Sequence, residues 1–302
     1  MMKRMMFLLA CMFMGTMMVQ AQLLYSISGN GLDKPSYVLG TYHFAASSFT
    51  QKIPGFSKAM AEVEQVCGEL DMEDMMKPEN LMKMQKAMML PDGQKIQQIL
   101  SKEEMDALNA CMKQLLGADL TNPAVGAQMG QFTPAALLLQ LNSLLYLKKD
   151  PSFNVNDGID TYVQTLAKKD NKKVLGFENI DKQINVLLQG QTLERQKQLL
   201  LCFLEHQDYY LQEADNLVNA YYAGDLDAIE KLGDQKLGDG CDATDEENEL
   251  LIYGRNADWI VQMPAIMKEN PTFFAVGAAH LVGEKGVLNL LKQAGYEVNP
   301  MK

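Results

Sequence analysis

The spacing of apolar residues predicts short strands near both ends of the chain and a long helical stretch between them. At the start, apolar runs at 23–28 and 37–41 flank Gly29-Asn30-Gly31, which favours a β-hairpin. A helix at 56–66 and a short strand at 66–70 are expected next. The end of the chain predicts a strand at 272–276, a helix at 286–293 and a strand at 296–298.

The middle of the chain, residues 72–150, is predicted to be mainly helical. Ser101 and Glu104 form a capping box before residues at helical spacing, with Gly117 as the stop, and Thr133-Pro134 begins another helix. Three elements follow: a buried strand at 173–177, one long helix at 193–222, and a helix at 246–268 that Pro264 kinks or breaks. The pattern favours an α/β fold in one domain over 22–302, with a central sheet formed from strands at both ends of the chain and a large helical insertion.

The first 21 residues have the features of a secretory signal peptide. Lys3 and Arg4 precede an uncharged run at 5–19, which is shorter than the ~20 residues that a spanning helix needs. Cleavage after Ala21 would export the chain to the periplasm or the extracellular space. A lipoprotein with Cys11 as its lipidated end is the less favoured alternative. No further long apolar run follows, so no membrane span is expected in the mature chain.

Charge and cysteine content restrict the function further. The net charge is −11, and it becomes −13 once the two positive charges of residues 1–21 are removed. Such an acidic chain is a poor nucleic-acid binder, because phosphate contacts need clustered Lys and Arg. The mature chain keeps four cysteines, whose wide spacing matches no zinc pattern and which could be buried thiols or disulfides in any of three pairings: Cys67, Cys111, Cys202 and Cys241. Methionines are dense over 72–89, where adaptable packing or an apolar groove is more common than copper binding.

Two of the three histidines occupy matching positions near opposite ends of the chain. An apolar strand runs into Gly40-Thr41-Tyr42-His43, and another runs into Gly277-Ala278-Ala279-His280. Each motif puts a histidine just past a strand end, where α/β sheets form their sites, and glycine permits the close backbone approach that such a site needs. Two neutral imidazoles and a carboxylate suit a divalent Mn, Co or Zn ion.

These motifs resemble the TraB/GumN family, which is related to the Tiki metalloproteases. The resemblance covers nearly the whole mature chain and is most specific at the end. It is carried by segments 27–43, Gly68-Glu69-Leu70-Asp71, 157–160, 174–178, 222–226, Arg255-Asn256-Ala257-Asp258-Trp259, 276–281, Gly286 and Gly295-Tyr296. It implies an active site made of both histidines and the strand glutamate, with a divalent metal and protease activity.

The candidate site residues each carry a stated role. His43, His280 and Glu69 are expected to be both catalytic residues and metal ligands. Glu178 is expected to be a second carboxylate ligand or a partner of a histidine. Arg255 could stabilise charge on a tetrahedral intermediate, or form an ion pair with one of the many acids.

Other polar residues near these motifs are expected to be structural, or their role is left open. Asp71 would share a strand face with Glu69, and its role is open. Asp160 is expected to serve a helix start. His206 is expected to lie in the core or on the surface.

The sequence therefore predicts an exported metal-dependent hydrolase, most plainly a peptidase, whose partner is a peptide or small-molecule substrate. Two alternatives remain open. One is a non-catalytic binding or regulatory protein that holds a peptide or a haem-like ligand on the same fold. The other is a hydrolase of non-peptide esters. No nucleotide-binding glycine loop and no Gly-x-Ser-x-Gly elbow is present.

Overall fold

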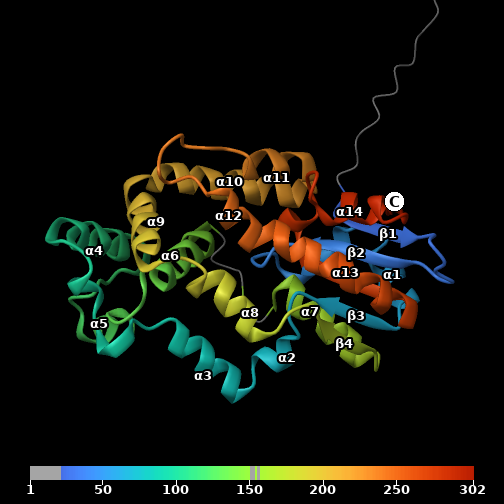
Figure 1. Ribbon diagram of the computed structural model, residues 1–302, viewed down its shortest axis with the longest axis horizontal. Helices are drawn as coiled ribbons and strands as arrows, with labels where there is room; N and C mark the ends of the chain where they lie inside the picture. The colour runs from blue at the N-terminus through green and yellow to red at the C-terminus, as the bar shows by residue number, and fades with distance from the viewer. Residues whose placement is uncertain (1–21, 150–153, 155–156) are drawn as a thin grey trace, which may run out of the picture.

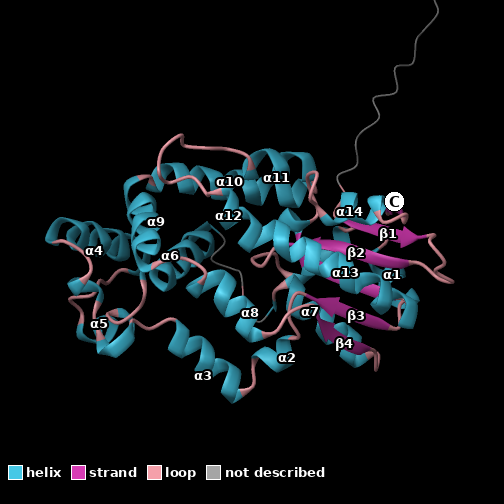
Figure 2. Cartoon of the chain, viewed as in Figure 1, coloured by secondary structure: helices cyan, strands magenta, loops and turns pink. Residues whose placement is uncertain are grey.

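Six strands form one mixed sheet in the order β4–β3–β5–β2–β1–β6. The computed structural model describes residues 22–149, 154 and 157–302, so the predicted signal peptide lies outside the described residues. The strands come from both ends of the chain, as the sequence predicts, with β3 and β4 contributed from between them (Figures 1 and 2). Their bounds are Leu24–Ser28 (β1), Ser36–Thr41 (β2), Gln65–Gly68 (β3), Lys173–Gly176 (β4), Thr272–Gly277 (β5) and Glu297–Pro300 (β6).

Four neighbouring strands run in the same direction. β2 pairs with β5, β5 with β3, and β3 with β4, all in parallel, whereas β1 is antiparallel to both of its neighbours. The predicted hairpin at the start of the chain is therefore present as β1 and β2. Because the four parallel strands end at one edge of the sheet, the residues that follow them are brought to that edge.

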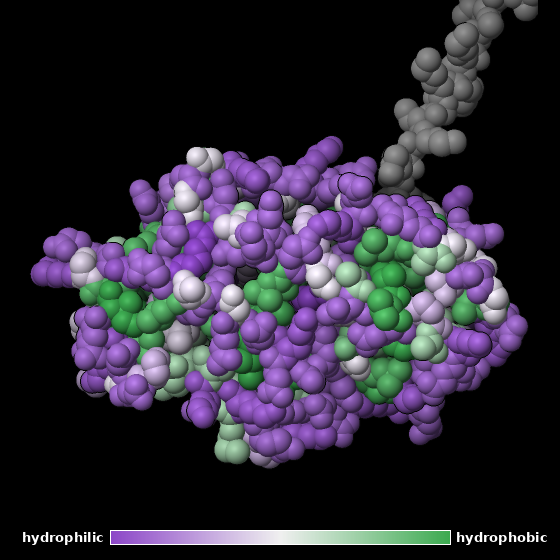
Figure 3. All heavy atoms as spheres, in the orientation of Figure 1, coloured by the Kyte–Doolittle hydropathy of each residue, from purple (hydrophilic) through white to green (hydrophobic). Residues whose placement is uncertain are grey.

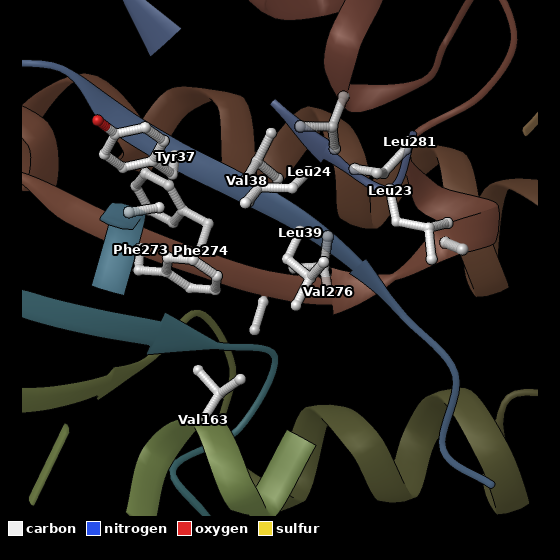
Figure 4. Packing of buried hydrophobic residues seen from close by; sticks show 14 of the residues in the cluster. Leu23, Leu24, Tyr37, Val38, Leu39, Val163, Phe273, Phe274, Val276 and Leu281 are labelled. Atoms are coloured by element: carbon white, nitrogen blue, oxygen red, sulfur yellow. The ribbon is translucent and has the colours of Figure 1, made fainter. Parts of the chain in front are cut away.

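Three inner strands, β2, β3 and β5, are buried along almost their whole length, whereas β1 is half-buried at most positions and β4, predicted to be buried, is partly exposed. Every residue of β2 and β3 is buried, and β5 is buried up to Val276. This is the pattern of a parallel sheet covered on both faces, where strands are continuously apolar instead of alternating. In Figure 4 the side chains of Val38, Leu39, Phe273 and Phe274 lie close together between the strands and their cover, with Val163 approaching from a helix.

Helices cover the sheet and also build a separate helical region. In Figure 1, α13 crosses the sheet while α4, α5, α6 and α9 lie at the far end of the molecule, where they pack around their own apolar cluster. The α-helices are Phe56–Glu62 (α1), Met72–Met75 (α2), Pro78–Ala87 (α3), Lys102–Leu116 (α4), Pro123–Met129 (α5), Pro134–Lys149 (α6), Ile159–Lys169 (α7), Ile180–Ile184 (α8), Leu193–Glu205 (α9), Gln207–Ala223 (α10), Leu226–Gly233 (α11), Asp245–Asn248 (α12), Gly254–Glu269 (α13) and Val287–Gln293 (α14). Shorter helical turns are Ser47–Lys52 (η1), Pro91–Gly93 (η2), Ile96–Gln98 (η3), Asn185–Gln189 (η5), Glu249–Tyr253 (η6) and Ala278–His280 (η7).

One helix prediction is wrong, and one alternative within another is excluded. The long helix expected at 193–222 is two helices, because the backbone leaves helical geometry at His206, with φ −108° and ψ 34°. The helix around Pro264 is not broken there: α13 runs through it, and the irregular turn is the π-helix η6 just before α13. The capping box of Ser101 and Glu104 is confirmed, as is the left-handed stop at Gly117.

The structure shows one disulfide and two free thiols, so both outcomes that the sequence left open for the cysteines occur. Cys202 on α9 is bonded to Cys241, while Cys67 and Cys111 are buried free thiols. Over the described residues, no helix is both long enough and apolar enough to cross a bilayer. The face in Figure 3 is mostly hydrophilic, with scattered apolar patches.

Candidate active site

The four parallel strands deliver four of the predicted site residues to the same edge of the sheet. His43 follows β2, Glu69 follows β3, Glu178 follows β4 and His280 follows β5. The fifth, Arg255, comes from the first turn of α13. Residues that lie more than 230 positions apart in the sequence are therefore neighbours here because β2 and β5 are paired.

Both glycines of the Gly-x-x-His motifs leave room for a neighbour. A Cβ at Gly40 would lie 2.9 Å from the Leu281 side chain and 3.1 Å from the Ala278 backbone. The close approach of β2 and η7 therefore depends on the absence of a side chain at this position. A Cβ at Gly277 would lie 3.3 Å from Oε1 of Glu69. That oxygen instead accepts a 2.9 Å hydrogen bond from the Gly277 N–H. The two glycines thus set the distance between the strands' polar ends.

Arg255 lies at the centre of a buried ionic cluster. Its Nη2 donates to Oε2 of Glu69 at 2.5 Å, and its Nε donates to Oε1 of Glu178 at 2.8 Å. The arginine and Glu178 side chains are 5% and 4% exposed. Glu178 also accepts hydrogen bonds from Trp259 Nε1 and Gln183 Nε2, so both of its oxygens are engaged. Of the two roles that the sequence allows for Arg255, the ion pair is the one that these contacts display.

The contacts of His280 define its tautomer. Arg255 Nη1 lies 3.1 Å from Nε2 of the histidine, and because a guanidinium can only donate, Nε2 must be the unprotonated acceptor. The other ring nitrogen, Nδ1, lies 2.7 Å from Oδ1 of Asn256 and donates to it. The Asn256 amide is oriented by donating its own N–H groups to the carbonyls of His280 and Lys285. His280 is therefore a neutral imidazole with a lone pair on Nε2.

His43 is held in a different way. Its Nδ1 lies 2.9 Å from Oδ2 of Asp160, and the other carboxylate oxygen accepts a hydrogen bond from Thr41 Oγ1. The expectation that Asp160 merely serves a helix start is therefore incomplete: it sits in the first turn of α7 and also orients His43. The imidazole itself is 69% exposed. A carboxylate on Nδ1 leaves Nε2 for another partner, the arrangement common around metal-ligating histidines.

The ionisation of these groups follows from their surroundings. Burial would raise the pKa of Glu69, but the charges around it, those of protonated His280, Arg255 and His43 in that order, lower it to about 2. Burial lowers the pKa of His280 to about 4, so this ring is neutral at pH 7. Asp160 raises the pKa of His43 to about 9. The two histidines, equivalent in the sequence motif, carry different charges in the fold.

A cavity of about 290 Å³ lies at this edge. His43, Glu69 and Asp160 line its polar part, and Leu70, Met72 and Met75 line an apolar part. The strand β3 ends at Gly68, so Asp71 does not share a strand face with Glu69 as expected. It is instead the N-cap of α2, accepting a hydrogen bond from Glu73 N–H.

Several residues of the site were not singled out from the sequence. Asn256 and Gln164 carry no motif of their own, and their contacts depend on the packing of α13 and α7 against the sheet, whereas Met72 and Met75 belong to the methionine-dense segment for which an apolar groove was expected. Asn256 directly follows Arg255 in the family-like segment 255–259, and this position beside a candidate site residue was a signal that could have identified it. His206, expected to be structural, lies between α9 and α10, with Nε2 3.5 Å from Asp239.

The ligand atoms of the predicted trio, His43, Glu69 and His280, are not gathered tightly around one point. Among the described residues, His206, Asp239 and Cys241 form a group of His, Cys, Asp or Glu whose ligand atoms all lie within 4.8 Å of one another. Its cysteine is consumed by the disulfide, so it offers no thiolate. His280 Nε2 lies 4.0 Å from Oε1 of Glu69, and His43 lines the same cavity as Glu69 without closing a group of that size.

Comparison with known proteins places the chain in a family. The profile of the TraB/PrgY/gumN family matches residues 23–300, so the chain belongs to this family. The chain is similar to Metalloprotease TIKI2 of Danio rerio, at 27% identity over 87% of this chain and 58% of the relative. It is also similar to Metalloprotease TIKI1 of Homo sapiens, at 26% identity over 88% and 60% respectively. The chain thus spans about three fifths of the length of these relatives. No solved structure gives a significant match.

Proposed function

We propose that this chain is an exported, metal-dependent hydrolase of the peptidase class. One observation carries the proposal: His43, Glu69 and His280 reach the same sheet edge, and each histidine is hydrogen bonded through Nδ1 to a side-chain oxygen. Holding a ring in this way fixes its tautomer and aims Nε2, which is how proteins prepare imidazoles as ligands. The names of the TIKI relatives support the same class of reaction.

The donor set suits a divalent ion of the Mn, Co or Zn kind. Two imidazole nitrogens and one carboxylate are the ligands such ions take, and Nε2 of His280 already has its lone pair free of a proton. His43, His280 and Glu69 would hold the ion, which supplies Lewis acidity by polarising a carbonyl and lowering the pKa of water. Because Arg255 now donates to both His280 and Glu69, ion binding requires that these two hydrogen bonds are exchanged.

The residues around the ligands would have supporting roles. Glu69 is a carboxylate at neutral pH, so it can hold an ion without first losing a proton, whereas its pKa of about 2 makes it a weak base. Glu178, whose oxygens are engaged by Arg255, Trp259 and Gln183, would anchor the arginine instead of binding metal directly. Stabilisation of a tetrahedral intermediate by Arg255 stays a prediction.

The decisive experiment uses purified chain lacking residues 1–21. Metal content is measured, and peptide cleavage is followed with Mn, Co or Zn and with chelator. We expect metal-dependent cleavage that is lost in a His43→Ala, His280→Ala double variant and retained in His206→Ala. The last variant removes the third histidine, which lies away from the cavity. Full cleavage by the double variant would overturn the proposal.

A non-catalytic binding role is favoured by one feature, the closed set of hydrogen bonds around Arg255. These contacts satisfy Glu69 and His280 without any ion. A ligand as large as haem is disfavoured in this cavity, because 290 Å³ is at the small end of the range of about 300–1,000 Å³ usual for small-molecule pockets. Peptide binding that survives loss of both histidines, with no turnover of any peptide or ester, would support the binding role.

A further inference from the structure

Three apolar residues in the lining of the cavity have no part in the proposed hydrolytic chemistry. They are Leu70, Met72 and Met75, here called the apolar wall, and Glu69 immediately precedes Leu70 in the chain. An apolar wall therefore begins one residue from the carboxylate that the proposed function uses. The cavity as a whole is about 290 Å³, a size suited to one or two side chains.

The position of this wall is determined by a buried amide. Gln164 on α7, 4% exposed, donates from Nε2 to the carbonyl of Leu70 at 2.7 Å and accepts from the Met72 N–H at 2.9 Å. A Cβ at Gly68 would lie 2.7 Å from that same Nε2, so the glycine makes space for the amide. The segment that carries the apolar wall is thus tied to α7, the helix that also carries Asp160.

We propose that this apolar wall binds an uncharged apolar side chain of a polypeptide substrate, next to the bond that is cleaved. The inference rests on the proposed function and names its substrate class. Methionine side chains are unbranched and adaptable, so Met72 and Met75 suit several apolar residues such as Leu, Met and Phe. The side chains of the wall offer no cation and no hydrogen-bond donor, so an acidic residue there would lose its hydration without compensation.

The test compares peptides on a Gly-Ser background that differ at one position, which carries Leu, Gly or Asp. Cleavage gives kcat/KM and KM for each peptide with the metal-loaded protein. Fluorescence anisotropy gives the affinity of the same labelled peptides for protein stripped of metal. We expect the Leu peptide to be favoured over the Gly and Asp peptides by roughly tenfold or more in both measurements.

Variants of the wall give the second arm. A Met72→Ala, Met75→Ala double variant should lower the ratio of kcat/KM for the Leu peptide to kcat/KM for the Gly peptide to near one. The change should appear in KM. Met72→Lys, which leaves the packing of Met75 in place, should shift the preference toward the Asp peptide. Met82→Ala is the matched control, because Met82 is 65% exposed on α3 and does not line the cavity.

The outcomes separate this inference from the proposed function. Binding that favours the Leu peptide without cleavage of any peptide would refute the hydrolase and keep the pocket. Cleavage with equal kcat/KM for Leu and Gly peptides, or an unchanged ratio in both wall variants, would overturn the pocket and keep the hydrolase. Absence of both cleavage and binding would overturn both.

Discussion

Replacing Arg255 with methionine tests how the buried carboxylates of the site are kept ionised. The guanidinium pairs with Glu69 and Glu178, whose side chains are 16% and 4% exposed. Methionine keeps an unbranched side chain like the aliphatic part of arginine and carries no charge. Packing along that part is therefore kept, while two carboxylates lose their cation. Removing one partner of a buried ion pair typically costs about 3–5 kcal/mol, because the remaining charge stays desolvated.

The size of this loss should depend on pH. In the variant, burial acts on Glu69 without the opposing charge of Arg255, which raises the pKa of that carboxyl, so the folded state binds more protons than the wild type does. The stability of the variant then rises relative to that of the wild type as the pH falls. The wild type does not gain in this range, because the folded pKa of Glu69 is about 2. The deficit of Arg255→Met should therefore be about 3–5 kcal/mol at pH 8 and clearly smaller at pH 5.5.

Urea unfolding measures this deficit, with Trp259 as the reporter. It is the single tryptophan of the chain, it is buried, and the Arg255 guanidinium lies 4.9 Å from its ring. Adding Glu178→Gln to the variant removes one unpaired charge and should recover about 1–2 kcal/mol at pH 8. A deficit below about 1 kcal/mol that is equal at both pH values would refute the reasoning and leave Arg255 free for a purely catalytic role.

Three further predictions follow from single contacts. Changing both Cys202 and Cys241 to serine should cost about 4 kcal/mol in urea unfolding, from the loop entropy of a 39-residue separation, and reductant should then no longer affect the protein. The pKa of His280 is about 4 in the folded chain and about 6.5 in the unfolded chain, so the wild type should lose up to about 3 kcal/mol of stability as the pH falls through that window. Thermal melts over this pH range should show a smaller loss for a His280→Gln variant. Gly40→Val should cost about 1–3 kcal/mol by calorimetry, since its Cβ would press on the Ala278 backbone, and an unchanged Tm would show that β2 and η7 are free to separate.

The sheet could be predicted from the sequence because its strands carry strong local signals. Continuous apolar runs bounded by turn residues placed β1, β2, β4, β5 and β6 close to their observed bounds. The break at His206 could not be predicted in this way, because residues on both sides of it keep helical spacing. Tertiary contacts meet at this break: Cys202, one turn earlier, is bonded to Cys241, and His206 Nε2 lies 3.5 Å from Asp239.

The candidate site was predictable only in part, for a related reason. His43, Glu69, Glu178 and His280 follow strands, so strand ends were enough to place them at one edge. The partners of the two histidines, Asn256 and Asp160, come from α13 and α7, and no local pattern says how those helices pack on the sheet. A residue that acts by orienting another leaves no spacing of its own in the sequence.

The two histidines show what such partners add to a motif. Gly-x-x-His occurs twice, yet His280 is buried, neutral and aligned by an amide, while His43 is exposed and aligned by a carboxylate. An amide oxygen accepts a hydrogen bond without favouring a charged ring, whereas a carboxylate favours the imidazolium. His280 can therefore offer Nε2 without releasing a proton, and His43 must lose one first. The motif supplies two equivalent side chains, and the helices that pack beside them give each a different chemistry.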